Sequence, residues 1–120
     1  MKINFNKTLS GLDGKTLKGN DETKPIKNDK GEIVSYELTE IKFSTIAINA
    51  LMAEEFDEDG KVKQLDPVER VRRFALAQKI TMEKKEADFE LEDVVLIKSL
   101  IGKNYKSTLI VGASYQEFPK

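Results

Sequence analysis

The chain has 120 residues, enough for one domain, and it contains neither cysteine nor histidine. These absences exclude disulfides, thiolate nucleophiles and cysteine-based zinc sites, and they remove the side chain that most often titrates near neutral pH. Its 20 basic and 21 acidic residues leave a net charge of −1, so no whole-protein field draws the chain to nucleic acid or to an anionic membrane.

The first 43 residues are predicted to form strands and turns. Ile3 and Phe5 alternate with polar residues, which is the pattern of a half-buried strand. Asp13-Gly14 is a turn dipeptide. The polar run 18–30 has almost nothing to bury, so we expect a mobile loop there.

A second strand follows the turn at Gly31. Val34, Tyr36 and Leu38 share one face of it, and the alternation breaks near Thr39. Residues 1–43 are therefore predicted to contain a β-hairpin or a small antiparallel sheet.

Residues 44–120 are predicted to contain three or four helices. Ser44 is expected to cap the first. Asp66-Pro67 opens the second, with the carboxylate as N-cap and proline at the first helical position. The spacing of Val68, Val71 and Ala75, with Leu76 beside them, predicts the buried face of this helix.

Two further segments complete the helical half. Gly102 is expected to end one helix as its C′ residue. Ser107 is the expected cap of a last helix over 107–117, although its β-branched residues and Gly112 leave a strand open. The fold class is α+β, in a single domain of residues 1–120.

Two loops suggest ligands, each with a simpler interpretation. Residues 11–16 end like a phosphate-binding loop but lack its first glycine, so a hairpin turn explains them as well. Residues 55–66 place Glu55, Asp57 and Asp59 as in a calcium loop, with Gly60 at the sharp turn. Asp66 at its last position is too short for the usual contact, and an acidic loop between helices is the alternative.

Two surfaces suggest partners. Arg70, Arg72 and Arg73 form a basic cluster that suits phosphate contacts, with an exposed salt-bridged face as the alternative. The helices also carry more apolar residues than one buried face can hold. Phe74 and Leu96 depart from the best stripe of their helices, so they are the candidate partner-binding residues.

The helical half resembles a group of small accessory proteins encoded by tailed bacteriophages and prophages. The matching features are the Leu-Asp-Gly-Lys of 12–15, the small-residue helix of 44–52, the Leu-Ala-x-Lys-Ile end of 66–80, and the approach to the third helix at 89–101. The resemblance implies the cytoplasm of an infected or lysogenic bacterium and carries over no functional residue.

These observations together predict a non-enzymatic protein that works by binding. We expect it to need no cofactor or metal and no membrane, and to bind a phage or host protein or a second copy of itself. An assembly factor and an inhibitor of a host system are both open. The alternative function is a nucleic-acid-associated regulator that uses Arg70, Arg72 and Arg73.

Overall fold

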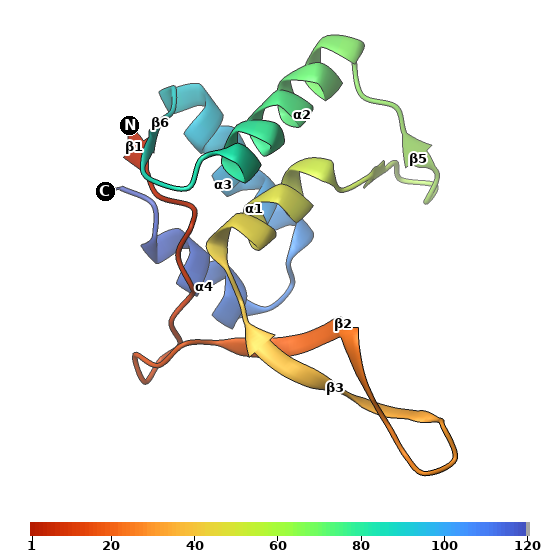
Figure 1. Ribbon diagram of the computed structural model, residues 1–120. Coiled ribbons are helices and arrows are strands. Elements are labelled where there is room, and N and C mark those ends of the chain that lie inside the picture. Colours follow the sequence, from red (N-terminus) through yellow and green to blue (C-terminus); the bar gives the residue numbers. More distant parts are fainter. Residues whose placement is uncertain (120) are drawn as a thin grey trace.

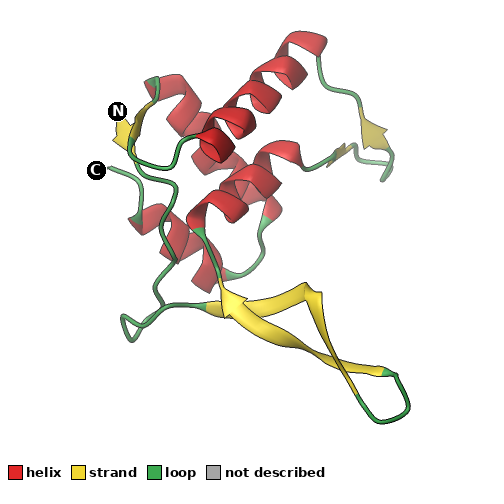
Figure 2. Ribbon diagram, in the orientation of Figure 1, coloured by secondary structure: helices red, strands yellow, loops and turns green. Residues whose placement is uncertain are grey.

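The computed structural model describes residues 1–119. Its elements follow one another as β1 (Lys2–Ile3), β2 (Lys18–Lys27), β3 (Ile33–Glu40), α1 (Phe43–Met52), β4 (Glu55–Phe56), β5 (Val62–Lys63), α2 (Pro67–Met82), β6 (Ala87–Asp88), α3 (Leu91–Asn104) and α4 (Thr108–Gln116). The strands pair antiparallel as β1–β6, β2–β3 and β4–β5 (Figures 1 and 2). The predicted α+β class is therefore confirmed.

The core lies around α1, which packs against both α2 and α3. Phe43, at the start of α1, is fully buried, and its ring stacks on Phe5 with the centroids 4.6 Å apart. Phe118 meets Phe43 edge-on at 5.1 Å, and Phe89 meets Phe5 edge-on at 5.2 Å. This aromatic cluster joins the N-terminal segment, the β6–α3 junction and the C-terminal turn to α1, and such pairs add to the stabilisation from burial alone.

The strands β2 and β3 form a long hairpin, here called the arm (residues 18–40), which projects from the helices (Figure 1). The prediction of a loop over 18–30 was wrong for residues 18–27, which form β2. A strand ladder is made by backbone groups, so a polar segment can pair without burying side chains. Residues 21–24 of β2 lie opposite Glu37, and this irregularity bends the arm.

The base of the arm is closed by three backbone hydrogen bonds. The amide of Leu9 donates to the carbonyl of Ile41 at 2.8 Å, the amide of Ile41 donates to Leu17 at 2.9 Å, and the amide of Leu17 donates to Leu9 at 2.8 Å. Leu9 is fully buried, while Leu17 and Ile41 pack partly against the core. The arm is thus anchored where its two strands leave the helical body.

One turn design occurs three times, at residues 11–15, 28–32 and 57–61. In each turn the fourth residue is glycine, at φ of 77° to 80°, and its amide donates to the carbonyl three residues earlier at 3.0 Å. A type I turn followed by a left-handed residue closes a three-residue hairpin loop, and glycine adopts that conformation without steric cost. The hairpin interpretation of residues 11–16 therefore holds, with Ser10 paired to Thr16.

Two of the predicted helix caps are confirmed and one is wrong. The amide of Val68 donates to Asp66 Oδ1 at 2.8 Å, so Asp66 caps α2 as predicted. Ser107 caps α4, which confirms the helix over this segment and excludes the strand. At α1, however, the N-cap is Lys42 instead of Ser44, because the helix begins two residues earlier than the pattern indicated.

Gly102 does not end α3, which continues to Asn104 with Tyr105 as its C-cap. A Cβ at Gly102 would lie 2.5 Å from the hydroxyl of Tyr115. That hydroxyl donates to the carbonyl of Lys98 at 2.8 Å. Glycine therefore leaves room for the Tyr115 side chain to reach α3, at a cost of about 1 kcal/mol in helix propensity.

Candidate functional site

Helix α2 carries two stripes at helical spacing. The inward stripe contains Arg73, Leu76, Ala77 and Ile80, all of which are buried. The outward stripe is exposed and contains Val68, Val71, Ala75, Gln78 and Met82. The predicted burial of Val68, Val71 and Ala75 is therefore wrong, and Val68 and Val71 are 77% and 69% exposed.

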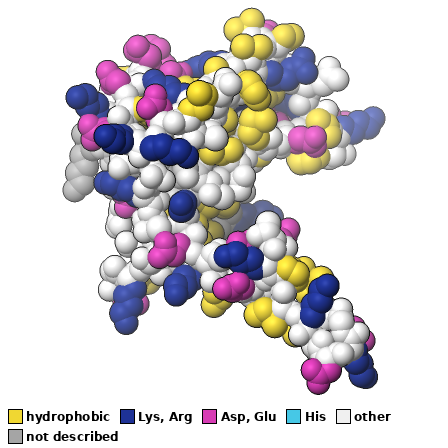
Figure 3. All heavy atoms as spheres, in the orientation of Figure 1, with side chains coloured by type: hydrophobic (Ala, Val, Ile, Leu, Met, Phe, Trp, Pro, Cys, Tyr) yellow, Lys and Arg dark blue, Asp and Glu magenta, His cyan; other side chains and the backbone are white. Residues whose placement is uncertain are grey.

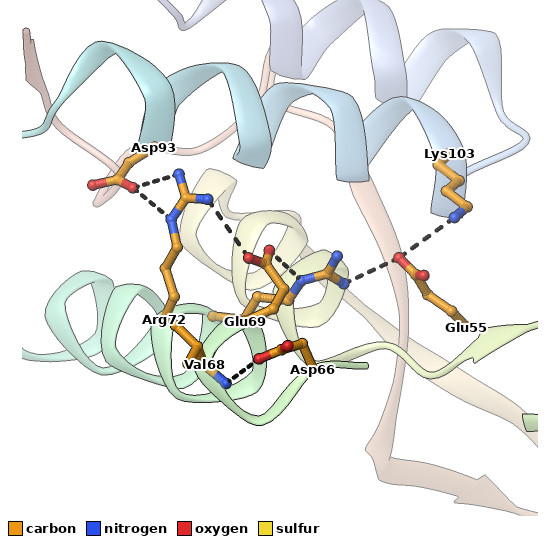
Figure 4. Close-up of polar contacts among 8 residues, drawn as sticks. Glu55, Asp66, Val68, Glu69, Arg72, Asp93 and Lys103 are labelled. Carbon is orange, nitrogen blue, oxygen red and sulfur yellow. Dashed lines mark hydrogen bonds and ion pairs between the residues drawn. The ribbon is translucent and has the colours of Figure 1, made fainter. Parts of the chain in front are cut away.

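The inward side of α2 carries the larger apolar side chains Leu76 and Ile80 together with Arg73, which forms an ion pair with Glu55 (Figure 4). Arg73 Nη1 lies 3.1 Å from Glu55 Oε1, and the two side chains are 10% and 8% exposed. Arg73 Nε also lies 3.2 Å from Glu69 Oε1, and Lys103 reaches Glu55 at 3.4 Å. A buried guanidinium needs such partners, and Glu55 supplies one directly beneath α2.

The charge state of Glu55 follows from the same contacts. Burial opposes its ionisation, but the hydrogen bond and charge of Arg73, joined by those of Lys103, outweigh burial and hold the pKa of Glu55 below its usual value. Glu55 is therefore an anion at neutral pH and complements the inward-facing Arg73.

The other two arginines of the predicted basic cluster point elsewhere. Arg72 donates through Nε and Nη2 to Asp93 Oδ1 at 3.1 and 2.9 Å, and it lies 3.6 Å from Glu69. The hydrogen bond to Asp93 is the main cause that raises the pKa of Arg72. Arg70 is exposed. The three arginines thus do not form one shared face, because Arg73 points inward to Glu55 and Arg72 points to Asp93. The charges of Arg72 and Arg73 are also each neutralised by carboxylates.

A groove borders α2 on each side, and each has a volume of about 460 Å³. One groove lies between α2 and the segment from α1 to β5, and it is lined by Met52, Val62 and Phe74 among others. The other lies toward α3 and is lined by Arg72 with Leu91, Val95 and Leu96 among others. The two candidate partner-binding residues, Phe74 and Leu96, therefore lie on opposite flanks of α2.

Together these residues form a broad apolar surface. We call it the α2 face and define it as the outward stripe with its flanking residues Met52, Phe74, Leu91, Val95 and Leu96. Phe74 is 57% exposed, whereas Leu96 is half-buried against the core. Figure 3 shows hydrophobic side chains gathered along α2 and continuing toward β4 and β5.

The calcium-loop alternative is not supported by the geometry of residues 55–66. This segment folds as the β4–β5 hairpin. Asp57 Oδ1 accepts from the amides of Asp59 and Lys61 inside the turn, while Glu55 is paired with Arg73 and Asp66 caps α2. Within residues 1–119, no three acidic side chains are grouped so as to hold a metal ion.

The sequence did not lead us to expect that five residues of the α2 face are exposed, namely Val68, Val71, Met82, Leu91 and Val95. A signal for the first three was present, because the outward stripe repeats at intervals of three and four residues. The inward stripe has the same periodicity, however, and includes a charged residue, which made it the less favoured buried face.

Comparison with protein-family models, curated proteins and solved structures finds no match to this chain. Within residues 1–119, the helices are too short or too polar to cross a membrane.

Proposed function

We propose that the protein binds another protein through the α2 face and that this binding, without chemistry of its own, is its function. One observation carries the proposal. Val68, Val71 and Met82 are 69% to 77% exposed on one side of a single helix, and further apolar side chains flank them. A contiguous apolar patch on a folded domain typically marks an interaction site.

The energetics favour a covered face. Fully burying one Val, Leu or Met side chain contributes roughly 1.5–3 kcal/mol, so a partner that covers several of them gains enough to offset the cost of association. The apolar centre is bordered by Arg70, Lys79 and Glu92, all exposed. An apolar centre with a charged rim is the usual anatomy of a protein–protein interface.

The proposed biological setting rests on the resemblance of the helical half to phage and prophage accessory proteins. In the cytoplasm of a bacterial host, such a protein would serve as an assembly factor or as an inhibitor of a host system. Both roles require a binding surface and neither requires a catalytic group, which suits a chain without histidine or cysteine.

The nucleic-acid alternative has weaker support. Of the three arginines that would carry it, Arg72 and Arg73 already pair with Asp93, Glu69 and Glu55. A phosphate would have to displace these carboxylates, so Arg70 is the arginine best placed to contribute.

The test compares variants as bait in a capture experiment from bacterial lysate, with bound proteins quantified by mass spectrometry. Val71→Lys and Phe74→Lys should each reduce specific capture by about tenfold or more, because each buries a charge in the interface. Leu12→Lys is the matched control, since Leu12 is fully exposed in the turn of residues 11–15. Melting temperatures close to that of the wild type would show that the fold is intact.

Two outcomes would contradict the proposal. Equal capture by all three variants would mean that the α2 face binds nothing. Capture of nucleic acid that falls steeply with salt and is lost in Arg70→Ala would favour the alternative function.

A further inference from the structure

We propose that the arm carries a second interaction site, the free edge of β3, and that its occupant is an extended segment of another protein in which apolar residues alternate with Lys or Arg. This segment adds a third strand to the arm. The inference goes beyond the proposed function, because the arm and α2 are separate parts of the molecule (Figure 1). It follows from backbone pairing, from exposed side chains and from charge.

The outer edge of β3 is open and regular. Within residues 1–119, β3 pairs with β2 along one edge and with no strand along the other. No extra residue interrupts β3 between Ser35 and Glu40, whereas β2 carries the irregularity over 21–24 and contains Pro25, which has no amide to donate. A free edge offers backbone donors and acceptors to an added strand, which is a common way to bind an extended peptide. The edge of β3 is therefore the better site of the two.

The arm holds this edge where a partner can reach it. The arm projects from the helical body, and its side chains are mostly exposed (Figures 1 and 3). Its base is fixed by the backbone hydrogen bonds of Leu9, Leu17 and Ile41, so β3 is already extended before a partner arrives. A preformed strand loses less conformational entropy on binding than a disordered segment does.

The side chains of β3 match an alternating partner. Tyr36 and Leu38 lie two residues apart and so share one face of the ladder, on which Pro25 lies opposite Tyr36. Leu38 is 58% exposed, and apolar residues on an added strand would cover part of this surface. Glu37 lies on the other face. A strand with apolar residues on one face and basic residues on the other therefore complements β3.

The charges of β3 favour a basic partner. β3 and the residue before it carry three exposed carboxylates, Glu32, Glu37 and Glu40, and no lysine or arginine. None of the three forms an ion pair within residues 1–119. The cations of the arm lie on β2 and in its turn, namely Lys18, Lys24, Lys27 and Lys30. Opposite charges on neighbouring strands stabilise pairing and like charges weaken it, so β3 favours a strand with Lys or Arg over another copy of itself.

The experiment offers two capped peptides to the 120-residue chain. The natural peptide has the sequence of residues 33–40, and the basic peptide differs from it by Glu37→Lys and Glu40→Lys. The basic peptide should bind about tenfold more tightly by fluorescence anisotropy, because its charges attract those of β3. Hydrogen exchange should show new protection of amides within 35–40. A fully N-methylated basic peptide, which cannot donate backbone hydrogen bonds, should not bind.

Variants of the chain locate the site. Glu37→Lys in the chain should weaken binding of the basic peptide by about fivefold or more and strengthen binding of the natural peptide. Glu22→Lys is the matched control, because Glu22 is an exposed carboxylate on β2, and it should change neither affinity by more than about twofold. Val71→Lys on the α2 face should also leave both affinities unchanged, so the two sites are tested separately.

Each of four outcomes would overturn the inference. Equal or tighter binding of the natural peptide would make a second copy the favoured occupant. Binding that survives full N-methylation, or that protects amides of α2 instead of β3, would mean that no strand is added to the arm. Absence of binding by the basic peptide at about 1 mM would mean that this edge is not a site. The proposed function would stand in every case, because its own test depends on Val71 and Phe74.

Discussion

At the scale of single residues, Glu55 and Arg73 are the two charged side chains that are buried within residues 1–119. Taking two charges out of water is costly, and their attraction recovers this cost when further hydrogen bonds are present. Glu69 and Lys103 supply additional partners here. Arg73 lies on the inward side of α2 with Leu76 and Ile80, so Val71 and its neighbours face out, on the side that is offered to a partner.

We expect Glu55→Gln to lower the free energy of unfolding by about 2 kcal/mol. This is below the 3–5 kcal/mol usual for breaking a buried pair, because Glu69 still partners Arg73. Glu54→Gln is the matched control, because Glu54 is the preceding residue and its side chain is exposed. This substitution should change the free energy of unfolding by less than about 0.5 kcal/mol. Urea denaturation measures both, and equal effects would contradict the role of the pair.

The pH dependence provides a second check on Glu55. Because the pKa of Glu55 is lowered in the folded state, its stabilisation is fully present above the ordinary glutamate pKa and is lost as the pH falls through the lower folded value. The difference between wild type and Glu55→Gln should therefore stay constant above the ordinary glutamate pKa of 4.5 and shrink as the pH falls below it. A difference that stays constant with pH would mean that the charge of Glu55 does not stabilise the fold.

At the scale of elements, signals contained in neighbouring residues predicted the structure well. Asp66 and Pro67 act within one turn of helix, and both ends of that interaction are visible in the sequence. The burial of Arg73 depends instead on a partner, Glu55, which lies 18 residues away in sequence, so it could not be predicted from the helix itself. In the arm, β3 was expected from the alternation of Val34, Tyr36 and Leu38, whereas β2 was missed because its polar residues pair through backbone groups and bury almost no side chain.

We expect Asp66→Ala to destabilise the protein by about 1 kcal/mol, because the amide of Val68 loses its acceptor. Ser44→Ala should have a much smaller effect, since Lys42 is the N-cap of α1. Denaturation midpoints with unchanged slopes would measure both losses. An equal loss in the two variants would show that the Asp66 cap has no special role.

At the scale of the whole molecule, the arm sets the overall dimensions. The radius of gyration is 16.2 Å, against about 14 Å for a compact domain of this length. The side chains of the arm are mostly exposed, including Ile26, Ile33 and Val34. An isolated two-stranded hairpin is marginally stable, so this arm depends on its anchored base at Leu9, Leu17 and Ile41.

We expect the helical body to fold without the arm. Replacing residues 20–38 by Asn-Gly would leave the pairs Lys18–Glu40 and Gly19–Thr39 joined by a tight turn. The free energy of unfolding should change by less than about 1 kcal/mol, because little core surface is removed. Urea denaturation followed by far-ultraviolet circular dichroism measures this change, and an unfolded product would show that the arm is part of the core.

The arm also bears on solubility, because both of its strands are edge strands. Unpaired edges can recruit further strands, and proteins commonly guard them with proline, lysine and bulges. β2 has all three, with Pro25 between Lys24 and Ile26 and the irregularity over 21–24. β3 has neither proline nor lysine and exposes Ile33, Val34 and Leu38. Aggregation at high concentration should therefore begin along the free edge of β3.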